Sequence, residues 1–228
     1  MALDQSSRAR LKAPKSAAIA GVVFSVLLMI SLVMVLTTVP ATVTGSDTWL
    51  IVSGKTLLLA LNLIPFAGVA FLWFIGVVRD RLGSREDRFM TTVFLSSGLL
   101  FLALLFVFAA VTGSIILLYT SQSTRALAPG YYAFGLIFAH DILNAYALKM
   151  AGVFMISTST LFIRTQIIPR WMAYLGYGLA GLMLLRISHL DRLGWVALAL
   201  PLWVLLISLY ILIDNYRHVA ETSTPANL

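Results

Sequence analysis

Apolar residues occur along this chain in long runs that short polar segments separate. An α-helix rises about 1.5 Å per residue, so about 20 apolar residues cross a hydrocarbon core of about 30 Å. Six runs approach or exceed this length: residues 17–39, 56–78, 90–118, 131–163, 171–187 and 193–213. The pattern predicts an all-α membrane protein with a six-transmembrane-helix bundle over residues 17–213. We expect a basic arm over residues 1–16 and a tail over residues 214–228.

The composition agrees with a membrane protein and excludes several other classes of protein and of functional site. The 228 residues are 60% hydrophobic and 11% charged, whereas soluble domains contain roughly 25% charged residues. The first apolar run exceeds the roughly 7–15 residues of a cleaved signal core, so we expect it to remain as a helix. The chain contains no cysteine, which excludes disulfides, thiol catalysis and cysteine-ligated metal centres.

Basic residues are distributed unevenly between the polar segments. An N-terminus in the cytoplasm places Arg8, Arg10, Lys12, Lys15, Arg79, Arg81, Arg85, Arg88, Arg164, Arg170 and Arg217 on the cytoplasmic side, against Lys55, Arg125, Arg186 and Arg192 on the other side. This bias follows the positive-inside rule. The net charge of +7 therefore predicts a bundle with both ends in the cytoplasm, and not nucleic-acid binding.

Local signals predict where some of these helices begin, end and pack. Gly83 is suited to ending the second helix, and Ser84 with Asp87 resembles a capping box that opens the third. Pro169 stands where the fifth helix begins, and a missing N–H costs little there. Small residues four apart, as in Gly176 and Ala180, favour close contact between membrane helices.

A few polar residues lie within the apolar runs, where an uncompensated polar group is costly and often functional. Counted at about 1.5 Å per residue, Asn62, Lys149 and Arg186 fall in the outer third of the bilayer, and Asp141 and Asn144 lie near its outer boundary. We therefore expect the inner half to be almost wholly apolar. These five residues form a candidate solute-binding layer that lines an outer vestibule.

A helical projection of the fourth run also places part of this layer on one face. Asp141, Asn144 and Lys149 fall in one arc with the small residues Gly152 and Ser159. The arc indicates a face turned toward the bundle, with Lys149 and Arg186 as cations for an anionic solute. A structural alternative remains open, in which small residues only permit helix packing and long cationic side chains extend to the headgroups.

Two further features are candidates for chemistry. The pairs His140–Asp141 and His189–Asp191 are both expected on the outer face, where imidazole and carboxylate groups can ligate a divalent metal, although no second ligand stands at helical spacing. Pro65 and Pro201 lie near the expected middles of the second and sixth helices. A proline there kinks a helix and frees a carbonyl.

Three stretches resemble a family of uncharacterised bacterial integral membrane proteins. They are residues 62–83, residues 144–150, and residues 168–171 together with the Pro201-Leu-Trp-Val segment of the last helix. The resemblance covers residues 15–215 and implies a six-helix bundle in the bacterial cytoplasmic (inner) membrane. It implies no reaction and no functional residues.

These patterns favour a small membrane protein with no enzymatic activity, because no catalytic motif occurs in the sequence. The first hypothesis is a transporter, channel or permease-like subunit, and the second is a structural or regulatory subunit that packs against a partner complex. A membrane enzyme or metal site at the outer face is the third. No cofactor is expected, and the expected partners are the lipid bilayer, a second copy of the chain or another membrane protein.

Overall fold

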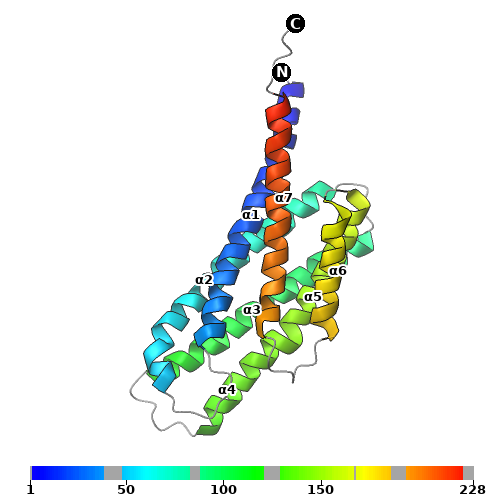
Figure 1. Cartoon of the computed structure of the whole chain (residues 1–228). Coiled ribbons are helices and arrows are strands. Elements are labelled where there is room, and N and C mark those ends of the chain that lie inside the picture. Colours follow the sequence, from blue (N-terminus) through cyan, green and yellow to red (C-terminus); the bar gives the residue numbers. More distant parts are fainter. Residues whose placement is uncertain are drawn as a thin grey trace.

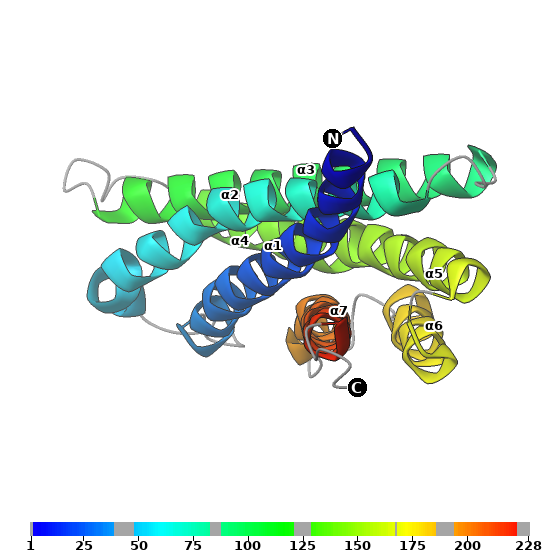
Figure 2. The ribbon, with the colours of Figure 1, turned by 90° about the horizontal axis from the view of Figure 1, so that it is seen from above.

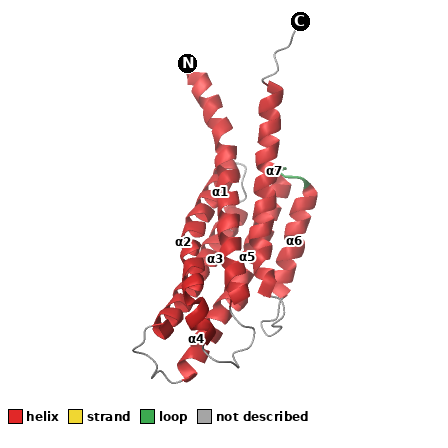
Figure 3. Ribbon diagram, turned by 60° about the vertical axis from the view of Figure 1, so that its left-hand side comes forward, coloured by secondary structure: helices red, strands yellow, loops and turns green. Residues whose placement is uncertain are grey.

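The computed structural model describes residues 2–38, 48–82, 88–120, 129–166, 168–185 and 194–222. All regular structure within these ranges is helical (Figure 3). The elements are α1 (Ala2–Thr38), α2 (Thr48–Leu82), α3 (Arg88–Thr120), α4 (Pro129–Asp141), the π-helix η3 (Ile142–Ala147), α5 (Leu148–Thr165), α6 (Arg170–Leu185), the 3-10 helix η4 (Gly194–Leu198) and α7 (Ala199–Thr222). Because α4, η3 and α5 are continuous, and η4 continues into α7, these elements form six rods.

The six rods run alternately in opposite directions along the bundle (Figure 1). The N-terminal end of α1 and the C-terminal end of α7 consequently lie at the same end of the molecule. We call this the terminal end and the opposite one the distal end. The C-terminal ends of α2 and α5 and the N-terminal ends of α3 and α6 also lie at the terminal end, while α4 begins at the distal end (Figure 1).

The order of packing differs from the order in the chain. Helix α1 packs against both α2 and α7, and α3 packs against α2 and the α4–η3–α5 rod. Helix α6 packs mainly against α5 and makes a smaller contact with α7 (Figure 2). Neighbouring rods therefore follow the order α7–α1–α2–α3–α5–α6, and the contact between α6 and α7 closes this order into a ring.

Five helices are long and apolar enough to cross a membrane: Ala18–Thr38, Ser53–Arg79, Phe89–Leu118, Phe134–Thr165 and Trp195–Asn215. They match five of the six expected runs. The expected crossing at residues 171–187 is a helix, but α6 has 16 described residues, which span about 24 Å and fall short of the hydrocarbon thickness. The fold is therefore an all-helical apolar bundle with five candidate spans, compatible with an integral membrane protein.

Some of the expected helix boundaries appear in the structure. Helix α6 begins at Arg170, directly after Pro169, whose carbonyl accepts a 3.1 Å hydrogen bond from the N–H of Met172. Pro65 lies inside α2 as expected, but Pro201 lies in the first turn of α7 and not near its middle. The proposed cap at Gly83, Ser84 and Asp87 is outside the described residues.

Aromatic rings fill the centre of the bundle. Phe71 on α2 lies with its ring centroid 4.5 Å from that of Phe24, 6.4 Å from Phe74, 5.7 Å from Phe101 and 5.1 Å from Phe154. The ring of Phe154 also stacks at 5.1 Å on that of Phe94, so α1, α2, α3 and α5 all contribute to this aromatic cluster. Its six phenylalanines are at most 3% exposed.

Candidate functional site

The fourth rod is interrupted by the π-helical segment η3 at Ile142–Ala147, an unusual backbone conformation among the described residues. Its wider turn is seen in the N–H of Leu148, which bonds to the carbonyl of Leu143, five residues earlier. Such bulges displace the regular ladder of hydrogen bonds and often occur at functional sites. Asn144 lies within the bulge, and its Nδ2 donates a 3.0 Å hydrogen bond to the carbonyl of His140. The buried amide thus supplies a donor where the regular ladder is displaced.

A polar pair precedes the bulge. The Nδ1 atom of His140 lies 3.6 Å from Oδ1 of Asp141, and the two side chains are 46% and 50% exposed. Within the described ranges, no group of three or more His, Cys, Asp and Glu residues gathers at one place. The other expected metal ligands, His189 and Asp191, lie outside the described residues, so the metal site stays a prediction.

The five residues of the expected vestibule do not share one environment. Asp141 is half-buried and Asn144 is buried, and both belong to one stretch of the fourth rod. Asn62 and Lys149 are exposed on the outside of the bundle, and Arg186 lies outside the described residues. The structure therefore associates Asp141 and Asn144 around η3, while Asn62 and Lys149 point away from the protein interior.

The helical projection of the fourth run was only partly right. That projection assumes 3.6 residues per turn throughout, whereas a π-helical turn contains more and rotates every later position relative to every earlier one. After the bulge, Gly152 and Ser159 do face the bundle, where they meet Ala180 and Gly176 of α6. Lys149 also follows the bulge but is exposed, and Asn144, within η3, lies in the segment that packs on α3.

Hydroxyl groups form a second set of buried polar residues, which were not among the predicted site residues. Ser25, Ser31, Ser97, Thr112, Ser157, Thr158, Ser159 and Ser208 are all buried. Most of them lie in the half of the bundle nearer the terminal end, which is the half that was expected to be almost wholly apolar. A serine or threonine can bond within its own helix, as Ser97, Thr112, Ser157 and Thr158 do. The hydroxyls of Ser25, Ser31, Ser159 and Ser208 have no hydrogen-bond partner among the described residues. The signal was the Ser-Thr-Ser-Thr run at residues 157–160.

Two of the buried serines lie where helices approach most closely. A methyl group added at Gly21 of α1 would overlap Oγ of Ser208 on α7, and one at Gly176 of α6 would overlap Oγ of Ser159 on α5. Neither serine Oγ has a hydrogen-bond partner among the described residues. These groups thus mark tight helix packing, in which weak Cα–H···O contacts are common.

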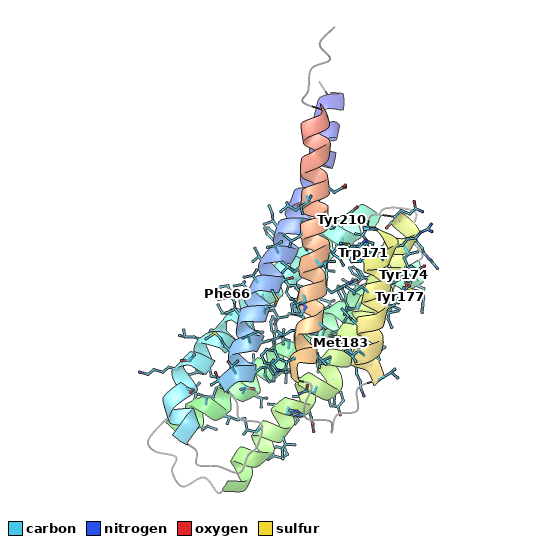
Figure 4. All side chains as sticks on the ribbon, in the orientation of Figure 1. Phe66, Trp171, Tyr174, Tyr177, Met183 and Tyr210 are labelled. Atoms are coloured by element: carbon cyan, nitrogen blue, oxygen red, sulfur yellow. The ribbon has the colours of Figure 1, made fainter. Side chains whose placement is uncertain are left out.

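The contact between α5 and α6 also includes a polar bond. The hydroxyl oxygens of Thr160 and Tyr177 lie 2.7 Å apart, and Thr160 also donates to the carbonyl of Ile156 at 2.9 Å. Tyr177 lies with Tyr174 and Trp171 on α6 (Figure 4). With Gly152 and Gly176, this bond fixes the antiparallel register of the two helices.

Comparisons of the chain with protein-family models, with curated protein sequences and with solved structures find no match. The resemblance to a bacterial membrane-protein family therefore stays a prediction. Function must be argued from the arrangement of side chains alone.

Proposed function

We propose that this protein is an integral membrane subunit that acts through lateral contact with other membrane proteins and conducts no solute through its own core. The observation that supports this most directly is the aromatic cluster around Phe71. It fills the centre of the bundle, where a path between the two membrane faces would have to pass. Among the residues of known burial, the buried polar ones are hydroxyls and one amide, and none is charged.

The outer surface supports the same proposal. Large apolar side chains such as Leu59, Phe66, Trp73 and Phe134 are each at least 65% exposed, whereas soluble monomers rarely present wide apolar patches to water. Lipid tails and apolar faces of other membrane proteins are the surroundings that such a surface suits. We further propose that both chain ends lie in the cytoplasm, from the distribution of arginine and lysine, and that the membrane is a bacterial inner membrane, as the resemblance described above implies.

The orientation can be tested because the chain has no cysteine of its own. Gln166, which is exposed after α5 at the terminal end, can be replaced by cysteine and treated in intact cells with a membrane-impermeant maleimide. We expect labelling only after the cells are permeabilised. Labelling in intact cells would reverse the proposed orientation.

The proposed function is tested by reconstitution and by purification from native membranes. Proteoliposomes should show no more flux of K⁺, Cl⁻, phosphate or amino acids than empty vesicles. Purification in mild detergent should recover a stoichiometric membrane partner, and Trp171→Ala, Tyr174→Ala or Phe134→Ala on the outer surface should reduce its recovery. The internal substitution Ser157→Ala provides the control. Flux above background without any stoichiometric partner would overturn the proposal.

A carrier is the second candidate, and the π-helical segment favours it. Asn144 in η3 and the His140–Asp141 pair are the polar groups that a solute entering at the distal end would meet. If this candidate is correct, a solute flux in proteoliposomes falls strongly with Asn144→Leu or Asp141→Asn. Lys149→Leu and Asn62→Leu, which replace outward-facing residues, should then leave that flux unchanged.

A further inference from the structure

Helix α2 carries an outward-facing stripe with a regular spacing. The stripe consists of Leu59, Asn62, Phe66, Val69, Trp73 and Gly76, which follow one another at alternating intervals of three and four residues. All six positions are exposed, and Leu59, Phe66, Val69 and Trp73 are 58–68% exposed. Phe66 lies on the outer edge of the bundle in Figure 4. This interval repeats every seven residues and is the spacing that keeps one seam of a helix facing another helix.

Asn62 is the polar residue within this stripe. No hydrogen bond joins its amide to another residue in the described part of the chain. The span runs from Ser53 to Arg79, so Asn62 lies about 13 Å from one end and about 25 Å from the other at 1.5 Å per residue. At that depth the bilayer contains no water to satisfy the amide, and an unsatisfied polar group in hydrocarbon costs several kcal/mol.

The chemistry of the amide indicates what covers it. An asparagine side chain both donates and accepts, so two such groups that meet across a two-fold axis satisfy each other, whereas a lipid tail can do neither. All copies of one chain insert with the same orientation, so an axis along the membrane normal brings Asn62 opposite Asn62 of a second copy. Gly76 on the same stripe has open space around its Cα, which allows a second helix to approach closely.

We propose that α2 is the homodimer interface of this protein, formed by the stripe from Leu59 to Gly76, and that Asn62 forms the hydrogen bond between the two copies. Ser96 on the outward face of α3 differs from Asn62, because its hydroxyl donates a 2.7 Å hydrogen bond to the carbonyl of Thr92 in its own helix. Ser96 therefore requires no hydrogen-bond partner from a second copy. The proposal goes beyond the function proposed above, since both a partner-binding subunit and a carrier can be dimeric.

Single-cysteine crosslinking tests this interface in a chain that has no other thiol. Val69→Cys places a thiol on the stripe, and Leu99→Cys places one on the outward face of α3, each about 15 Å along its helix from the terminal end. Purified variants in phosphatidylethanolamine–phosphatidylglycerol vesicles are oxidised with copper phenanthroline. We expect at least tenfold more disulfide-linked dimer with Val69→Cys than with Leu99→Cys. Equal yields, or no dimer with either variant, would overturn the proposal.

A second measurement tests the role of the amide. Resonance energy transfer between labelled copies, titrated against lipid dilution, gives the dissociation constant of the dimer in the same vesicles. Asn62→Leu should raise that constant about threefold to tenfold, the range that one interhelical polar bond contributes in membranes. Asn62→Gln should retain most of the affinity, because it keeps both donor and acceptor. An unchanged dissociation constant for Asn62→Leu would refute the hydrogen bond between the two Asn62 side chains.

These outcomes are independent of the proposed function. Loss of the dimer would leave the absence of flux as it is, since that depends on the aromatic cluster. The test of partner recovery uses Trp171, Tyr174 and Phe134, which lie outside the stripe. Flux through a dimeric protein would in turn overturn the proposed function and leave the interface intact.

Discussion

The indole Nε1 of Trp203 on α7 donates a 3.1 Å hydrogen bond to the backbone carbonyl of Met172 on α6. Trp203 is 1% exposed, and its ring also lies against Gly176 of α6. Since α6 makes its main contact with α5, this side chain is an important part of what joins α6 to α7 and closes the ring of helices.

We expect Trp203→Phe to lower the free energy of unfolding by about 1–2 kcal/mol, because it removes a buried donor and some packing volume. Unfolding by sodium dodecyl sulfate from mixed micelles, followed by circular dichroism, measures this change. Trp195→Phe in η4, where the side chain is 56% exposed, is the matched control and should change the value by less than about 0.5 kcal/mol. Equal effects of the two substitutions would show that the bond to Met172 contributes nothing.

The two glycines of the Gly176-Tyr177-Gly178 segment should respond differently to substitution. A Cβ at Gly176 would overlap Ser159 and approach Cζ2 of Trp203 to 2.7 Å, whereas nothing lies within 4 Å of one at Gly178. Gly176→Ala should therefore destabilise the bundle by about 1–3 kcal/mol through overpacking. Gly178→Ala should be neutral or stabilise by up to about 1 kcal/mol, because alanine favours the helix. The same micelle titration measures both changes in the free energy of unfolding. A Gly176→Ala variant as stable as the wild type would contradict the close approach of α5 and α6.

Phe71 should be among the most sensitive positions in the core. Its ring contacts four others, so Phe71→Ala leaves a large cavity and should cost about 3–5 kcal/mol. Phe134→Ala, which truncates a ring that is 68% exposed, should cost less than about 1 kcal/mol. Differential scanning fluorimetry in detergent would rank the two variants. A loss for Phe134→Ala as large as that for Phe71→Ala would argue against the aromatic cluster.

The amide of Asn144 should stabilise the π-helical segment. Asn144→Ala removes the hydrogen bond to the carbonyl of His140, and we expect a loss of about 1–2 kcal/mol. Hydrogen exchange in peptides that cover residues 140–149 should become faster, while exchange in α3 should not change. Tyr146→Phe provides a control within η3, because this side chain is 60% exposed. Unchanged exchange in Asn144→Ala would mean that the backbone alone maintains the bulge.

The helices could be predicted from the sequence because a membrane helix is defined by a long apolar run and little else. Five runs became helices of spanning length, and Pro169 correctly indicated the start of α6. Which face of each helix packs inward could not be predicted in the same way. In lipid both faces of a helix are apolar, so the periodicity that distinguishes inside from outside in a soluble protein is weak. Asn62 was therefore assigned to an internal vestibule, although it lies on the outside of α2.

Only part of the candidate site could be predicted from the sequence. Asp141 and Asn144 do lie together, because they are close in sequence. Lys149 was assigned to the same face, but it is exposed, although Gly152 of the same helix α5 faces the bundle. Nothing in the sequence indicates the π-helical turn at Ile142–Ala147. The buried serines were overlooked because hydropathy gives little weight to hydroxyls, although their positions beside Gly21 and Gly176 report the closest helix contacts.

The contact between α1 and α7 joins the first and the last helix of the chain. During synthesis α1 leaves the ribosome before α7, and the residues that will cover Gly21, above all Ser208, are translated only after α2 to α6. One face of α1 is therefore left without its permanent neighbour while every intervening helix is inserted. Closure of this contact must wait for α7, and a nascent chain truncated before α7 would present that uncovered face to the insertion machinery or to lipid.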